Sequence, residues 1–177
     1  MKKLLATLFF GSLLFAQNIN LNLQITNSTI AGYVETPIVV EENVKIRGMY
    51  LYNDNKNKNN FYFAGIKAEG NLIGSCCSNV KFSILTDFVH TKSNSAIALG
   101  FGVFSFIPHF EFPVFVRAEA EYAPKVLSFD DADRFSKIDA QIGYAPITNA
   151  EIFLGYRSIS FNHNYNSAVY FGIGYNF

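Results

Sequence analysis

Tryptophan is absent from this chain of 177 residues, cysteine occurs only twice, and charged residues make up just 16% of the sequence. Basic and acidic residues balance at 14 each. No basic patch or nucleic-acid-binding signature is present, so we expect no nucleic-acid partner. Half of the residues are hydrophobic, yet no helical period runs through them, which argues against a helical fold.

The two cysteines, Cys76 and Cys77, are neighbours in the sequence. Two cysteines do not make a zinc site. Adjacent cysteines pair with each other only through a strained disulfide in a turn. We interpret them as non-functional turn residues, with a vicinal or an intermolecular disulfide as the alternative.

Long apolar runs are also missing, since none reaches the roughly 20 residues that a membrane-spanning helix needs. The run Leu4–Phe15 follows the basic residues Lys2 and Lys3 and ends at the small residue Ala16. This is the layout of a secretory signal peptide. We therefore expect residues 1–16 to be a signal peptide and residues 17–177 to form one domain.

From Asn18 onward, apolar and polar residues alternate with a period of two, which predicts strands. We expect ten, at residues 18–26, 29–37, 43–53, 60–70, 80–91, 95–106, 113–123, 133–145, 149–161 and 167–177. A tilted strand crosses a bilayer in about 9–11 residues, close to most of these lengths. The predicted fold is all-β, a transmembrane antiparallel up-and-down β-barrel of ten strands. If the first two strands pair outside the wall, the barrel has eight.

Sorting each strand by parity separates two faces. One face is apolar and carries no charge, whereas the other carries seven basic and seven acidic residues. A soluble barrel such as a lipocalin, apolar inside and charged outside, gives the same alternation. Three features favour charges inside and lipid outside. Seven glycines share the charged face, seven of the ten tyrosines lie on the apolar face, and the bulky apolar residues exceed what a small barrel could enclose.

Charges inside a barrel are costly unless they pair. We expect a lumenal charge network that plugs the barrel and holds it rigid, with a narrow or gated pore as the alternative. Its predicted members are Lys45, Arg47, Lys67, Glu69, Arg117, Glu119, Glu121, Lys137, Asp139, Glu151 and Arg157.

The last strand, Ser167–Phe177, is amphipathic and ends on an aromatic residue. It resembles the closing strand of bacterial outer-membrane barrels, which the assembly machinery recognises. We therefore predict Tyr175 and Phe177 as an assembly signal. The expected location is the outer membrane of a Gram-negative bacterium, with the lipid bilayer and the assembly machinery as partners. With both ends in the periplasm, residues 53–60, 91–95, 124–132 and 162–166 would be outer loops.

Residues 119–135 read E-A-E-Y-A-P-K-V-L-S-F-D-D-A-D-R-F, and Gly143-Tyr144 and Gly155-Tyr156-Arg157 follow. This pattern resembles the YfaZ family of small outer-membrane proteins over roughly residues 115–177, and more loosely before that. Cys76-Cys77 is not part of the pattern. The resemblance implies an outer-membrane barrel without a settled activity or catalytic residues to transfer.

Catalytic side chains are few. His90 has Ser93 and Ser95 nearby and Asp87 on the opposite face, but spacing alone does not make a Ser-His-acid set. His109 and His163 belong to separate connections. Asp130, Asp131 and Asp133 match no calcium-loop spacing, so a hydrated loop is the favoured interpretation. We expect no enzyme, cofactor or metal; a lipid-modifying barrel enzyme and a soluble periplasmic carrier are the alternatives.

Overall fold

The structure is a computed structural model that describes residues 19–38, 41–54, 59–71, 80–108, 112–162 and 164–177. Strands make up most of this part of the chain, and its one helical element is the 3-10 turn η1 (Lys125–Leu127). No helix within these ranges is long and apolar enough to cross a membrane. The predicted signal peptide, Cys76, Cys77, His109 and His163 lie outside the described residues.

Ten long strands and one short strand form a single sheet. They are β1 (Asn20–Ile25), β2 (Thr29–Ile38), β3 (Glu41–Asn53), β4 (Phe61–Asn71), β5 (Val80–His90), β6 (Asn94–Phe106), β7 (Val114–Ala123), β8 (Ser128–Asp130), β9 (Phe135–Ile147), β10 (Ala150–Phe161) and β11 (Asn164–Asn176).

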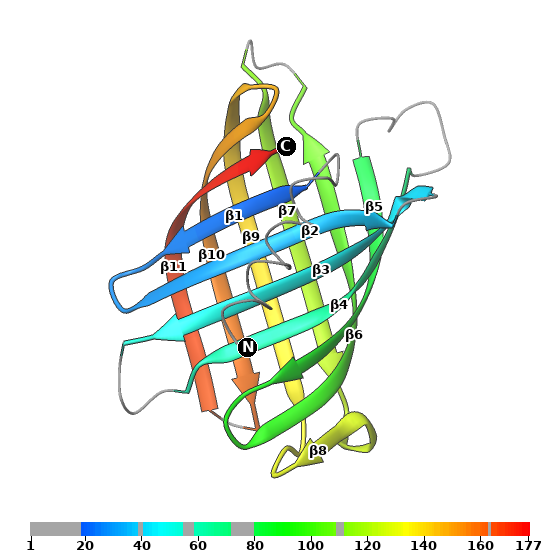
Figure 1. The fold of residues 1–177 in the computed structure, drawn as a ribbon, viewed down its shortest axis with the longest axis vertical. Helices are drawn as coiled ribbons and strands as arrows, with labels where there is room; N and C mark the ends of the chain where they lie inside the picture. The colour runs from blue at the N-terminus through cyan, green and yellow to red at the C-terminus, as the bar shows by residue number, and fades with distance from the viewer. Residues whose placement is uncertain (1–18, 39–40, 55–58, 72–79, 109–111, 163) are drawn as a thin grey trace, which may run out of the picture.

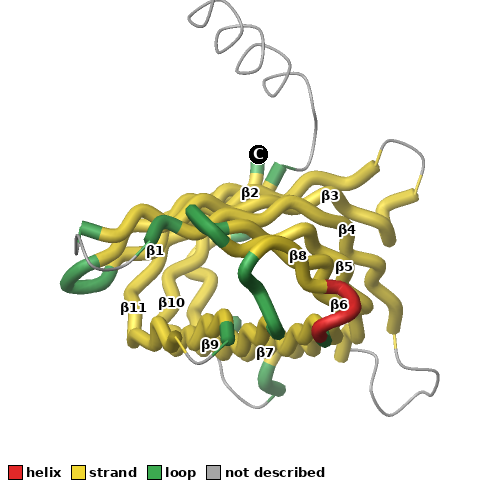
Figure 2. The backbone as a smooth tube through the Cα atoms, turned by 90° about the horizontal axis from the view of Figure 1, so that it is seen from below, coloured by secondary structure: helices red, strands yellow, loops and turns green. Residues whose placement is uncertain are grey.

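The sheet closes on itself because β1 pairs with both β2 and β11, with Leu21 opposite Tyr175. The prediction of a ten-stranded antiparallel barrel is confirmed, and the eight-stranded alternative is not needed. In Figure 1, β1 to β4 cross in front of β7, β9 and β10, as the tilted strands of a closed barrel do. Figure 2 shows the flattened outline of the wall from one end.

The barrel has two ends, named here by what lies at each. The terminal end is where β1 begins and β11 ends, and the loop end carries the connections from β1 to β2, β3 to β4, β5 to β6, β7 to β9 and β10 to β11.

The connection from β7 to β9 is more ordered than the loop predicted for residues 124–132. It contains η1 and then β8, which pairs with residues 94–96 of β6. Because the β6–β7 pairing stops at Leu99 opposite Tyr122, β6 extends beyond its neighbour, and β8 covers the edge left open. A strand of three residues is too short to show a period-two pattern, which is why the sequence did not indicate it.

The apolar face of the strands points outward, as predicted. Ile84 is 71% exposed and Phe101 73% exposed, and Ile138, Ile152 and Phe171 are exposed as well. The charged face points into the lumen, where Arg47 is 1% and Asp87 0% exposed. The lipocalin-like alternative, with apolar residues inside and charges outside, is therefore wrong for this wall.

Glycines on the inward face make room for large neighbours. Gly172 lies against the ring of Phe153 and Gly155 against the ring of Tyr170, and a Cβ at either position would overlap that ring. A similarly close approach occurs at the other inward glycines, Gly65, Gly100, Gly102, Gly143 and Gly174. The crowded interior expected from these seven residues is confirmed.

Candidate functional site

The lumen is the candidate functional site, because the charged side chains of the strands converge there. Its side chains form three layers along the barrel axis, which we call the ionic layer, the apolar layer and the terminal cavity. The ionic layer lies in the middle, the apolar layer at the loop end, and the terminal cavity at the end where the two terminal strands meet.

Arg47 is the centre of the ionic layer. Its guanidinium donates two hydrogen bonds to Asp87, from Nε at 3.0 Å and from Nη2 at 2.5 Å. It also donates to Glu119 at 2.7 Å and to Glu121 at 2.5 Å. Glu121 also forms an ion pair with Lys137, whose Nζ atom lies 2.8 Å from Oε1. The side chain of Arg47 is fully buried, so three carboxylates from two other strands compensate one charge that water does not reach.

A second group of ion pairs lies toward the terminal end. Lys45 contacts Glu35 at 3.0 Å and Glu69 at 2.8 Å. Lys67 contacts the same two carboxylates, at 3.5 and 2.8 Å, and reaches Glu119 at 3.7 Å. Because Glu119 also binds Arg47, the two groups form one connected set.

The other predicted members are held mainly by neutral groups. Arg117 is 3.6 Å from Glu151 and donates to Gln141 at 3.2 Å. Asp139 accepts hydrogen bonds from Tyr170 at 2.6 Å and from Gln141 at 2.9 Å.

Arg157 donates to Gln24 and lies 5.1 Å from the centre of the Tyr170 ring. Neither of these partners is charged. Tyr170 lies on the neighbouring strand β11, whereas Gln24 reaches Arg157 only because closure of the barrel brings β1 beside β11.

The structure therefore places all eleven predicted residues on the inner face, but it does not join them all by ion pairs. Glu35 and Asp87 belong to the connected set although they were not among the predicted members. Both lie on the charged face of their strands, so parity alone could have found them. The neutral partners Gln24, Gln141 and Tyr170 also lie on the inward parity, but nothing in the alternation marks them as partners of a charged group.

The apolar layer fills the lumen at the loop end. Phe135 stacks on Phe61 at 6.0 Å between ring centres and contacts Phe161 at 4.8 Å. The Nζ atom of Lys137 lies 4.2 Å from the centre of the Phe63 ring, which connects the apolar and ionic layers. The buried residues of this layer are Ala31, Met49, Leu51, Phe61, Phe63, Val89, Ala96, Ala98, Ala123, Ala132, Phe135, Ile159 and Phe161. The alternation of apolar and polar residues does not predict this layer.

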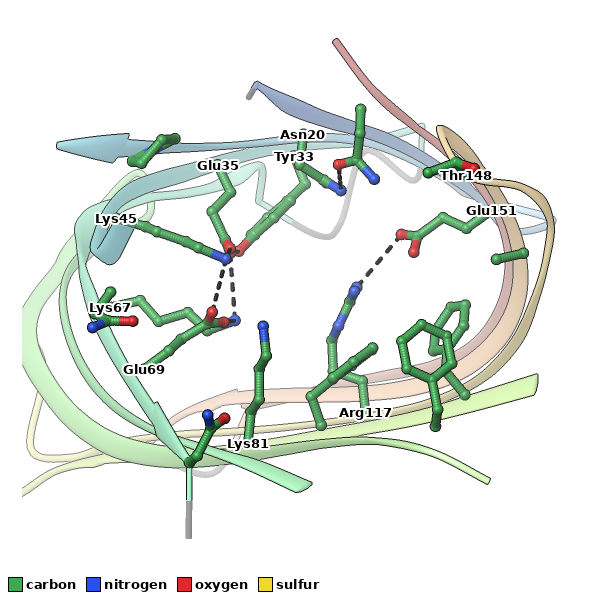
Figure 3. A pocket seen from close by; sticks show the side chains of 18 of the residues that line it. Asn20, Tyr33, Glu35, Lys45, Lys67, Glu69, Lys81, Arg117, Thr148 and Glu151 are labelled. Carbon is green, nitrogen blue, oxygen red and sulfur yellow. Dashed lines mark hydrogen bonds and ion pairs between the residues drawn. The ribbon is translucent and has the colours of Figure 1, made fainter. Parts of the chain in front are cut away.

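The terminal cavity has a volume of about 590 Å³. Figure 3 shows polar and charged side chains entering it from both sides of the wall, including Glu35, Lys81 and Arg117. A void of about 20 Å³ lies between the cavity and the apolar layer and has room for about one water molecule.

His90, the one histidine that the structure describes, belongs to a hydrogen-bonded chain at the loop end. Its Nδ1 atom is 2.7 Å from Ser95 Oγ, and that hydroxyl donates to Asp130 at 2.7 Å. In a catalytic triad the histidine lies between the serine and the acid, whereas here the serine lies between the other two. Since the hydroxyl proton points to Asp130, His90 donates to Ser95 and does not deprotonate it. Asp87 is far from this chain, in the ionic layer.

The acidic residues after η1 make local contacts. The Asp133 carboxylate is 3.0 Å from Lys125, and its backbone N–H donates to Asn162 at 2.6 Å. Asp131 accepts a hydrogen bond from the same asparagine through its backbone oxygen at 2.9 Å. Within the described ranges, no three His, Cys, Asp or Glu side chains are arranged to hold a metal ion.

The residues of the predicted assembly signal lie at the terminal end. Tyr175 and Phe177 are 43% and 61% exposed, and their rings meet edge to face at 4.7 Å. The backbone N–H of Phe177 donates to the oxygen of Ile19 at 2.9 Å, so the last residue is tied to the start of the barrel wall.

Comparison with solved structures gives distant likenesses. No family model matches the chain, and no curated protein matches it. A bacterial polysaccharide outer membrane secretin is 10% identical with a TM-score of 0.48, over 84% of this chain and 55% of that one. The chain thus spans about half of the secretin. The KdgM porin is 6% identical with a TM-score of 0.48, over 90% and 99% of the two chains.

Ail, the attachment invasion locus protein of Yersinia pestis, is 12% identical with a TM-score of 0.27, over 91% of this chain and 99% of that one. These neighbours are outer-membrane β-barrel proteins. With TM-scores of 0.48 or less, these likenesses support no particular function.

Replacing Arg47 with methionine tests the ionic layer. We expect a loss of about 3–5 kcal/mol in the free energy of unfolding, because Asp87 would stay buried without its cation and Glu121 would keep only Lys137. Urea unfolding of the barrel refolded in detergent micelles measures this. The control is Lys125→Met, which removes an exposed ion pair and should cost at most about 1 kcal/mol. Equal unfolding midpoints for the two variants would contradict the structural role of Arg47.

Proposed function

We propose that this protein is an outer-membrane β-barrel of a Gram-negative bacterium with a closed lumen, and that it acts through its wall and loops rather than by conduction or catalysis. The observation that carries the proposal is the outward apolar face of every long strand, combined with a lumen that is filled at the loop end and in the middle.

The outward face supports a membrane location. The exposed side chains on it include Ile30, Ile46, Ile66, Ile84, Phe88, Leu99, Phe101, Ile142, Leu154, Val169 and Phe171. Soluble monomers rarely expose a continuous apolar patch of more than about 600 Å². A belt of such residues around the whole barrel is instead what acyl chains would cover.

Outward tyrosines lie at both ends of this belt. Tyr50, Tyr62 and Tyr122 are exposed at the loop end, and Tyr175 is exposed at the terminal end. Transmembrane barrels place girdles of aromatic residues where the acyl chains meet the headgroups. The belt and its two girdles together support a spanning orientation, with the terminal end proposed to face the periplasm.

The closed lumen rests on two kinds of packing. The apolar layer occupies the loop end with aromatic rings such as Phe61 and Phe135, and the ionic layer below it is tied through Arg47. A permeating ion would have to separate buried ion pairs and then cross the apolar layer, and both steps are costly. The alternative of a narrow pore would need these side chains to move together.

A lipid-modifying enzyme is the second function considered, and the order of the hydrogen-bonded chain argues against it. Ser95 is 6% exposed and directs its proton to Asp130 rather than to His90. We propose that this chain fastens η1 and β8 to the hairpin of β5 and β6.

Membership of the YfaZ family is part of the proposal, supported by the motifs in residues 115–177. So is the assembly signal at Tyr175 and Phe177, supported by the exposure of both rings at the terminal end.

Planar bilayer recordings test the closed lumen. We expect no steady single-channel current from the wild-type barrel, because the apolar and ionic layers block its length. Replacing Phe61, Phe135 and Phe161 with alanine should raise the frequency of brief openings, since three rings of the apolar layer are removed. Steady open currents from the wild-type protein would contradict the proposal.

Cell fractionation tests the location and the assembly signal together. Wild-type protein should appear in the outer-membrane fraction and migrate differently on a gel before and after boiling. Phe177→Ala should lower this amount several-fold without preventing refolding in detergent. Phe112→Ala is the matched control, because Phe112 is 60% exposed, close to the 61% of Phe177, yet lies just before β7, away from the C-terminal residues. Equal losses for both variants, or wild-type protein in the soluble fraction, would refute the assignment.

A further inference from the structure

The terminal cavity has the size and the chemistry of a ligand site. Its volume of about 590 Å³ falls inside the range of about 300–1,000 Å³ typical of pockets for small molecules. The exposed residues Asn71, Lys81 and Thr148 stand among its lining residues. The apolar and ionic layers fill the rest of the lumen whether or not this cavity is occupied.

One wall of the cavity carries a row of side chains across neighbouring strands. Lys81 on β5 pairs in register with Phe104 on β6, and Phe104 pairs with Arg117 on β7. The row continues to Gln141 on β9. Since neighbouring strands are about 4.8 Å apart, the backbones of Lys81 and Arg117 lie roughly 10 Å apart with an aromatic ring between them. Figure 3 shows both cationic side chains pointing into the cavity from the same wall.

The charges that line the cavity leave a positive excess on this wall. Across from it, Glu35 and Glu69 are each held by both Lys45 and Lys67. The remaining carboxylate, Glu151, faces Arg117. The side chain of Lys81 forms neither an ion pair nor a hydrogen bond with any of the described residues. Four cations against three carboxylates line the cavity, and the unmatched cation is Lys81.

Arg117 has a fixed orientation but does not use all of its hydrogen-bond donors. Its guanidinium lies 5.5 Å from the ring centres of both Phe104 and Phe115 and donates to Gln141 at 3.2 Å. The contact with Glu151 is 3.6 Å, longer than the roughly 2.7–2.9 Å of a direct charge-assisted hydrogen bond. The guanidinium therefore keeps donors available while its aromatic neighbours fix its orientation.

We propose that the terminal cavity binds a small organic anion. Its carboxylate or phosphate lies between the Lys81 amine and the Arg117 guanidinium, and its uncharged body packs on Phe104. This goes beyond the proposed function, which needs only a closed lumen. Conduction by the barrel would contradict closure but not binding, and the absence of binding would leave closure intact.

Titration calorimetry of the refolded full barrel in detergent micelles tests this site. The probes are glucuronate and glucose 6-phosphate, with glucose as the uncharged control. We expect one or both anions to bind and glucose to bind at least about tenfold more weakly, because a charge-assisted hydrogen bond is worth about that factor. Preference between the two anions shows which charged group the site takes.

The variant Lys81→Gln should weaken anion binding about tenfold without affecting folding, since the Lys81 side chain forms no ion pair or hydrogen bond with the described residues. The matched control is Lys92→Gln, which removes an exposed lysine at the loop end and should bind like the wild type. Added salt should weaken wild-type binding, because the attraction is electrostatic. Failure of both anions to bind at millimolar concentration, or equal affinity in Lys81→Gln, would overturn the proposal.

Discussion

A wall one strand thick leaves each side chain two directions, into the lumen or out of the barrel, and this constraint organises the whole structure. Residues such as Phe101 and Ile84 face outward because the alternation leaves them no other place. The same alternation concentrates charge where water is scarce. Arg47 is stable there only because Asp87 and Glu121 converge on it from two other strands. The outer surface and the ionic layer are thus consequences of one pattern.

Packing inside the barrel joins layers of opposite character. Phe63 belongs to the apolar layer, yet Arg47 and Lys137 lie over its ring at 5.0 and 4.2 Å. Glycines complete the fit, since the ring of Phe153 occupies the space beside Gly172. In the closed lumen that we propose, aromatic and ionic packing act together, whereas the sequence suggested paired charges alone.

The strands and their orientation could be predicted from the sequence because a period of two is a local property of each segment. The apolar layer could not be predicted, since the alternation tells which face a residue is on but not how far along the barrel axis it lies. Phe61 and Phe135 share the inward face with charged residues and differ from them only in their height in the barrel. The partner of Arg157 was also beyond prediction. Gln24 lies 133 residues away and reaches it only after β1 and β11 close the wall.

Because the chain contains no tryptophan, a single introduced tryptophan can report which face of the wall contacts lipid. Single tryptophans would replace Phe101, which is 73% exposed, and Phe153, which is 2% exposed. Each variant would be refolded into vesicles that contain brominated lipids, which quench tryptophan on contact. The structure predicts strong quenching at position 101 and little at position 153. Quenching at position 153 without quenching at 101 would show that the wall is turned the other way.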